Sequence, residues 1–190
     1  MNTMSKKTIR DYIYYLETLK DIKEISSIAE ANFRTALKES DENSLEALKP
    51  KIDINLDEKE EIIRFHDKDF KKLFRKIAVK CHPDKISAIS DSVQVEFLKQ
   101  AYNDLNQANK EYDWGLLLKV AIDLKIDVDE LHPEQLENIN QKVKELHQEI
   151  EKYEKSMAYQ WYVKSDGENK QDYLNQCINI FNKFIASETN

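Results

Sequence analysis

Glycine and proline are scarce in this chain of 190 residues, which contains two glycines and three prolines. Tight turns depend on both residue types, so their scarcity disfavours β-sandwiches and β-barrels and favours long helices. The sequence also lacks a run of the roughly 18 apolar residues that a membrane-spanning helix requires. Its basic N-terminus leads into an amphipathic segment rather than the apolar core of a secretory signal. We therefore expect an all-α protein of about six helices that is cytoplasmic and not bound to a membrane.

Cysteine is equally sparse, because the only two, Cys81 and Cys177, lie far apart in the sequence. A disulfide framework usually needs more cysteines and an oxidising compartment. Neither cysteine has a second cysteine at metal-ligand spacing, and the four histidines form no H-E-x-x-H pattern. We expect two buried or half-buried thiols, no structural metal and no cofactor.

The formal net charge is −7, which argues against nucleic acid as the partner of the whole chain. The distribution of charge is more informative than the sum. Residues 68–85 contain seven basic and two acidic side chains, a local charge of +5. A positive patch on an acidic protein favours a negatively charged partner surface.

Apolar residues recur at three- and four-residue steps over most of the chain, the period of an α-helix. The period is lost around Pro50, where we expect a linker with a short helical turn at 44–48. Ser90 or Asp91 is positioned to cap a helix that runs to about Asn109. The resulting division has four parts: an N-terminal helix (1–40), a linker (41–57), a central region (58–127) and a C-terminal helical hairpin (128–190).

The last third of the chain contains a heptad seam that begins at Leu136 and ends at Met157. A turn around Gly167 separates it from an amphipathic segment over residues 174–185. A short connection favours antiparallel packing of the two helices, so we expect an intramolecular hairpin; dimerisation through the seam is the alternative. The aromatic residues near the hairpin tip are either core, which we favour, or a docking patch for a client: Tyr159, Trp161 and Tyr162.

The most informative segment is DFKKLFRKIAVKCHPDK, residues 69–85. On a helical wheel its basic and apolar side chains fall on opposite halves, with Val79 as the one misfit. Pro83 stops this helix, and the chain turns through His82-Pro83-Asp84. The basic half consists of Lys71, Lys72, Arg75, Lys76 and Lys80, and the apolar half of Phe70, Leu73, Phe74, Ile77, Ala78 and Cys81.

Residues 74–85 resemble the pattern Y-R-K-L-A-x-K-Y-H-P-D-K of the J-domain family. The family's next helix contains F-x-x-I-x-x-A-Y-x-x-L, and this chain keeps that spacing with Val95, Leu98, Ala101, Tyr102 and Leu105. Residues 110–113 are similar to the R-x-x-Y-D that often follows. The resemblance covers residues 69–113. A lone H-P-D tripeptide is a weak signal, but one between a basic amphipathic helix and an A-Y helix is a specific one.

The resemblance implies a co-chaperone that docks on a DnaK-type 70-kDa heat-shock ATPase and stimulates it, and not an enzyme. In the family, the H-P-D turn engages the ATPase where its domains and linker meet, a role that falls here to His82, Pro83 and Asp84. The basic helix docks on an acidic patch, a role that falls to Lys71, Arg75, Lys76 and Lys85. The absence of a Gly/Phe-rich linker and a zinc-binding cysteine set places the chain with J-domain-only proteins, whose flanking helices choose a client or site.

The chain departs from the family pattern at three points. Phe74 and Cys81 replace two tyrosines, and the usual first-helix pattern Y-x-x-L-x-V is missing upstream of Phe70. Either residues 58–66 or the N-terminal helix takes the place of that first helix. The missing pattern motivates an alternative function, a helical adaptor whose J-like core no longer stimulates an ATPase. A hydrolase that uses His82 or Cys81 is a third and weaker interpretation, since no catalytic constellation surrounds either residue in the sequence.

Overall fold

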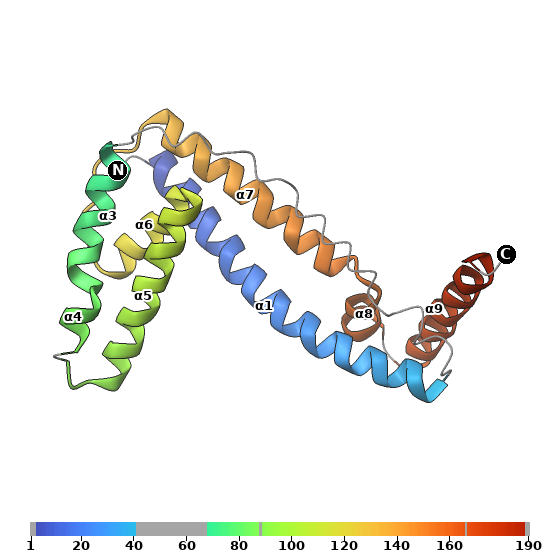
Figure 1. The fold of residues 1–190 in the computed structure, drawn as a ribbon. Coiled ribbons are helices and arrows are strands. Elements are labelled where there is room, and N and C mark those ends of the chain that lie inside the picture. The colour runs from blue at the N-terminus through green and yellow to red at the C-terminus, as the bar shows by residue number, and fades with distance from the viewer. Residues whose placement is uncertain (1–2, 41–67, 88, 166, 189–190) are drawn as a thin grey trace. The chain divides into compact units, whose positions relative to one another are not determined.

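The computed structural model describes residues 3–40, 68–87, 89–165 and 167–188 (Figure 1). These residues are helical apart from short connections, and no strand occurs among them, so the all-α prediction is confirmed for this part of the chain. The linker 41–57 and the segment 58–66 lie outside the described residues. The helices are α1 (Thr3–Ser40), α3 (Lys68–Cys81), α4 (Pro83–Ile86), α5 (Ser92–Glu111), α6 (Trp114–Asp123), α7 (Pro133–Glu154), α8 (Met157–Tyr159), the π-helix η1 (Gln160–Lys164) and α9 (Gly167–Glu188).

Within the described ranges, no helix has the length and apolar character that a membrane crossing requires.

The chain divides into two compact units, each built from two separate stretches of sequence. Unit 1 comprises Met1–Leu16 and Glu60–Leu146, and unit 2 comprises Glu17–Lys59 and His147–Asn190. Helices α1 and α7 each contribute to both units. The division by contacts therefore runs through these two helices, whereas the division by sequence keeps residues 1–40 as a separate part.

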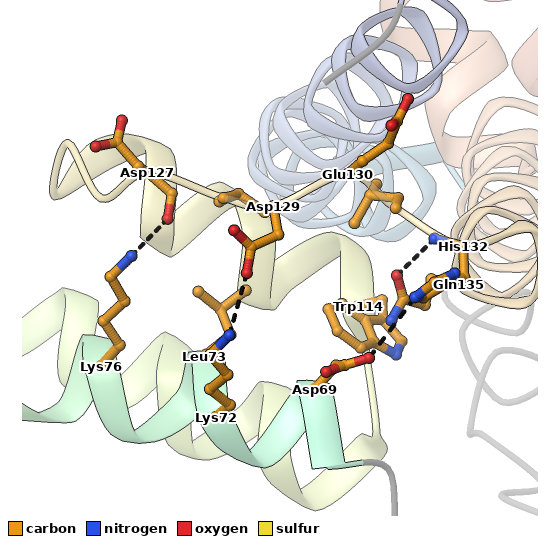
Figure 2. A pocket seen from close by; sticks show the side chains of 12 residues that line it. Asp69, Lys72, Leu73, Lys76, Trp114, Asp127, Asp129, Glu130, His132 and Gln135 are labelled. Atoms are coloured by element: carbon orange, nitrogen blue, oxygen red, sulfur yellow. Dashed lines mark hydrogen bonds and ion pairs between the residues drawn. The ribbon is translucent and has the colours of Figure 1, made fainter.

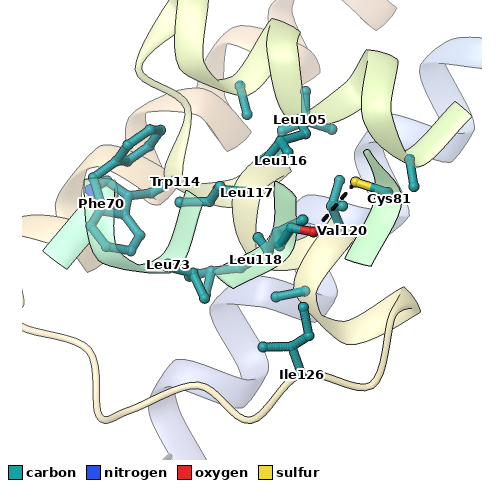
Figure 3. Close-up of a cluster of buried hydrophobic side chains, with 14 of the residues drawn as sticks. Phe70, Leu73, Cys81, Leu105, Trp114, Leu116, Leu117, Leu118, Val120 and Ile126 are labelled. Atoms are coloured by element: carbon teal, nitrogen blue, oxygen red, sulfur yellow. Dashed lines mark hydrogen bonds between the residues drawn. The ribbon is translucent and has the colours of Figure 1, made fainter. Parts of the chain in front are cut away.

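The core of unit 1 lies among α3, α5 and α6 (Figure 3). The first turns of α1 and α7 also contribute to it, through Ile9, Tyr12 and Ile139. Helix α6 is buried on most sides, as its largely apolar sequence requires. Helix α3 inserts the predicted apolar stripe, while Val79, the predicted misfit, is 59% exposed. The most completely buried side chains include Ile77, Leu105, Leu117, Leu118 and Ile139.

Helix ends in unit 1 follow from side-chain caps. Asp91 accepts hydrogen bonds from the backbone N–H groups of Val93 and Gln94 at 2.9 and 3.4 Å, so it is Asp91 rather than Ser90 that caps α5. Asp113 caps α6 through the N–H of Leu116 at 2.9 Å. Both caps satisfy backbone donors that have no partner within the first helical turn.

Unit 2 corrects two expectations about the C-terminal hairpin. Helix α9 buries Leu174 and Cys177 against α1 and the residues after α7, rather than against the heptad seam. The heptad helix also ends at Glu154, three residues before Met157, which is 38% exposed. Sequence periodicity gives the apolar face of a helix but not the identity of the helix that covers it, which explains the wrong partner.

Trp161 lies in the core of unit 2, as predicted. Its ring centroid is 5.5 Å from that of Phe33, and its indole N–H donates to the carbonyl of Lys170 at 3.2 Å. The Lys170 ammonium lies 4.3 Å from the centroid of the same ring, a cation–π distance. Tyr159 is buried as well, while Tyr162 is 37% exposed, so the aromatic group is mainly core. Gly167, expected within a turn, is the first residue of α9.

Candidate partner-binding site

The turn after α3 has a defined local geometry. His82 is in an extended conformation and acts as the N-cap of α4, with Pro83 at the first helical position. The imidazole Nδ1 accepts a hydrogen bond from the backbone N–H of Asp84 at 3.3 Å. The carbonyl of His82 accepts from the N–H of Lys85 at 2.9 Å. Capping and a fixed proline φ together restrict the turn to few conformations before any partner binds.

The Asp84 carboxylate points into solvent, with 89% of its side chain exposed. It lies 3.5 Å from His82 Nδ1, a contact that becomes an ion pair only when the imidazole is protonated. In the neutral ring, Nδ1 is the acceptor for the Asp84 N–H, which leaves the proton on Nε2. The turn therefore presents an exposed acceptor and an imidazole donor, both held by the same short helix.

The His82 ring also contacts α5. It meets the ring of Tyr102 edge-on, with centroids 6.0 Å apart and an interplanar angle of 79°. Tyr102 is half-buried on α5, so it connects the turn to a helix that the core holds in place. An open groove of about 640 Å³ runs beside this contact and is lined by Pro83, Ile86, Ser87, Ile89, Val95, Lys99, Tyr102 and Asn103.

The basic half of α3 separates into two stripes. Lys71 and Arg75 are exposed on one side of it, and Lys85 is exposed on α4 beyond the turn. The second stripe, Lys72, Lys76 and Lys80, binds the chain's own connection between α6 and α7. Of the four lysine and arginine residues predicted to dock, Lys76 belongs to this second stripe, so the structure does not bring all four into one open surface.

Each lysine of the second stripe has a specific acceptor. Lys80 Nζ donates to the carbonyl of Leu124 at 3.0 Å. Figure 2 shows the contacts of the other two lysines, and in the first of these Lys76 Nζ donates to the carbonyl of Asp127 at 2.8 Å. Lys72 Nζ binds the Asp129 carboxylate at 3.3 Å. A cavity of about 210 Å³ lies at this contact, lined on one side by α3 and on the other by residues 127–132.

Sequence reasoning missed this connecting segment as part of the site. The signal that was available is an alternation of apolar and acidic residues at positions 126–129, typical of an extended strand with one face on a core. Ile126 is buried and Val128 half-buried, whereas Asp127 and Asp129 are exposed. Periodicity alone could not show that the acidic face of the segment would lie beside a basic helix.

Cys81 lies in the core rather than in an open site. Burial raises the pKa of its thiol, and its Sγ contacts the carbonyl of Ile77 at 3.5 Å. A nucleophilic cysteine needs a lowered pKa and access, so the geometry gives no support to the hydrolase interpretation. Burial likewise raises the pKa of Cys177. Over the described ranges, no three or more His, Cys, Asp or Glu side chains gather in an arrangement that could hold a metal ion.

Comparison with known proteins finds no family model, no curated protein and no solved structure that matches this chain.

Proposed function

We propose that this protein is a cytoplasmic J-domain co-chaperone that docks on a DnaK-type heat-shock ATPase and stimulates its ATP hydrolysis. The observation that carries the proposal is the placement of His82, Pro83 and Asp84. They form a capped turn between the basic helix α3 and helix α5, which run side by side in opposite directions (Figure 1). A turn held between two antiparallel helices supports the proposal.

The start of α1 supports the proposal at the point where the sequence departs from the family. Ile9 and Tyr12 belong to the same buried cluster as Phe70, Leu105 and Leu117. The N-terminal helix thus covers the α3–α5–α6 core of unit 1 and supplies apolar contacts of the kind that the family's first helix provides. This favours the N-terminal helix as its substitute.

The physics of the turn fits a transient contact with a large partner. Lys71, Arg75 and Lys85 raise the encounter rate with an acidic surface and orient the complex, at modest affinity. Because the turn is already capped, little conformational freedom is lost when it docks. The exposed Asp84 carboxylate can accept a charge-assisted hydrogen bond from an arginine of the partner.

Single-turnover ATP hydrolysis by a purified DnaK-type ATPase tests the proposal. The wild-type chain should accelerate hydrolysis, and both His82→Gln and Asp84→Asn should abolish the acceleration. His147→Gln and Asp172→Asn make the same chemical changes in unit 2 and should leave it intact. If the wild-type chain does not accelerate ATP hydrolysis by an ATPase from the same cell, the proposal is contradicted.

The adaptor function stays as a second candidate because of one observation. Three of the five side chains in the basic half of α3 bind the chain's own residues 124–129, which reduces the surface that an ATPase can contact. An adaptor would bind its partner without accelerating ATP hydrolysis, and its binding would not depend on His82 or Asp84. Pull-down of the ATPase by wild type and by Asp84→Asn separates the two candidates.

A further inference from the structure

The connection between α6 and α7 lies along α3 in a regular register. From Lys80 to Asp69, successive side chains of α3 meet Leu124, Asp127, Asp129 and His132 in that order. Figure 2 shows the last three of these contacts. The two segments therefore run antiparallel, and three consecutive turns of α3 each contribute one lysine. A register kept over three turns indicates a specific docked segment rather than an isolated surface ion pair.

The segment is held from its other side by apolar contacts. Ile126 and Leu131 are 6% and 7% exposed and belong to the core of unit 1. The alternation of the extended chain then places Asp127 and Asp129 on the outer side, and Glu130 is exposed as well. Residues 125–130 carry three acidic side chains and one basic side chain, next to a helix whose exposed residues are mainly lysine. The segment therefore presents to α3 the same sign of charge that an acidic partner surface would present.

We propose that residues 124–130 are an internal competitor that occupies the Lys72–Lys76–Lys80 stripe and lowers its affinity for acidic protein surfaces. The proposal rests on the proposed function for the identity of the partner, but the competition concerns any acidic polypeptide. A partner gains the full basic face of α3 only when it displaces the lysine contacts of this segment. The first stripe, Lys71 and Arg75, provides the initial attraction.

The strength of the contacts suits a competitor that can be displaced. The side chains of Lys72 and Asp129 are 73% and 91% exposed, so water screens their ion pair. An exposed pair of this kind changes an equilibrium constant by a factor of about two to five. Loss of the acidic charges should therefore free Lys72 and weaken the attraction of the segment for the stripe, while the backbone carbonyls of Leu124 and Asp127 remain as acceptors for Lys80 and Lys76. Unit 1 should stay folded, because Ile126 and Leu131 keep the segment in place.

Binding of a fluorescein-labelled oligoglutamate peptide, followed by fluorescence anisotropy, tests the competition. The variant Asp127→Asn/Asp129→Asn/Glu130→Gln should bind the peptide about five to ten times more tightly than wild type at low salt. A matched variant, Glu24→Gln/Glu30→Gln/Asp172→Asn, changes the net charge equally in unit 2. It should gain less than about twofold, because these three carboxylates belong to unit 2 and not to the segment beside the lysine stripe. Equal gains in the two variants would overturn the proposal.

A thermodynamic cycle assigns the gain to the lysine stripe. In the background Lys72→Gln/Lys76→Gln/Lys80→Gln, the three substitutions in the segment should no longer tighten peptide binding. A gain of the same size in that background would overturn the proposal, since the acids would then act on another surface. Circular dichroism and urea unfolding establish that every variant is folded.

The ATPase assay separates failure of this inference from failure of the proposed function. Tighter peptide binding by the segment variant, with no ATPase acceleration by any variant, would support the competitor and contradict the co-chaperone. ATPase acceleration by wild type, with peptide binding unchanged by the segment substitutions, would do the reverse. If both proposals hold, the segment variant reaches half-maximal ATPase acceleration at a lower concentration than wild type.

Discussion

The hydroxyl of Tyr12 donates a 2.8 Å hydrogen bond to the carboxylate of Asp113, which is 101 residues away in the chain. Both residues are buried, at 2% and 5% exposure. Asp113 also caps α6, so a single carboxylate joins the start of α1 to the start of α6. Gly115 permits this close approach, because a Cβ at that position would lie 2.4 Å from the Tyr12 ring. The contact fixes the N-terminal helix on the core that supports the His82-Pro83-Asp84 turn.

Tyr12→Phe tests the energetic weight of this contact. The substitution removes the donor and leaves a buried carboxylate with one partner fewer, which should lower the free energy of unfolding by about 1–3 kcal/mol. Tyr14→Phe is the matched control, because Tyr14 is 63% exposed, and it should change stability by less than about 0.5 kcal/mol. Urea unfolding followed by circular dichroism measures both. Equal changes in the unfolding free energy for the two substitutions would show that the Tyr12–Asp113 hydrogen bond does not stabilise the fold.

The same pair predicts an unusual dependence of stability on pH. Burial raises the pKa of Asp113 above its ordinary value of 3.8, even though the Leu116 N–H and the Tyr12 hydroxyl oppose the shift. A carboxyl group with a raised pKa in the folded state favours folding at low pH, and this contribution is lost as the pH rises through its folded pKa. Most carboxylates show the opposite sign.

Asp113→Asn should therefore gain stability relative to wild type as the pH is raised from 3.8 toward neutrality. Asparagine keeps an oxygen that can accept from Tyr12 and from the first turn of α6, but it does not ionise. The measurement is the difference in unfolding free energy between the two proteins at several pH values. A difference that stays constant with pH would mean that Asp113 titrates alike in the folded and unfolded states.

Much of unit 1 could be predicted from sequence because its signals are local. The apolar stripe of α3 follows from helical spacing, and the start of α5 follows from a capping residue next to an apolar period. The contacts that decide the site are not local. The Tyr12–Asp113 hydrogen bond and the backbone acceptors of Lys76 and Lys80 join distant segments. A carbonyl acceptor has no sequence signature, since every residue carries one.

Two residues have a positive φ, and glycine substitutions at them should change stability in opposite directions. Lys125 and Tyr112 both have a φ of 52°, a conformation that favours glycine. Lys125 ends α6 with an exposed side chain, so Lys125→Gly should raise the free energy of unfolding by about 0.5–1 kcal/mol. Tyr112 lies 4.9 Å from Phe70 by ring centroid, so Tyr112→Gly loses a packed aromatic pair and should destabilise the protein. Stabilisation of both variants would show that the aromatic pair contributes less than the backbone strain.

Val79 offers a test of docking that leaves the core intact. It is 59% exposed on α3, and helical spacing places it between the Lys71–Arg75 stripe and the Lys72–Lys76–Lys80 stripe. Val79→Glu should weaken binding of the DnaK-type ATPase by about twofold to fivefold, and Val79→Lys should strengthen it, because each changes the charge at the centre of the basic face. The difference between the two variants should shrink as ionic strength rises from about 0.01 to about 0.15 M, where screening acts within about 8 Å.

Val163→Glu, at a 47% exposed valine of unit 2, should leave binding unchanged. Equal affinities for Val79→Glu and Val79→Lys at low salt would contradict docking through α3. If a basic face binds the partner, its affinity must depend on the sign of a charge added at the centre of that face.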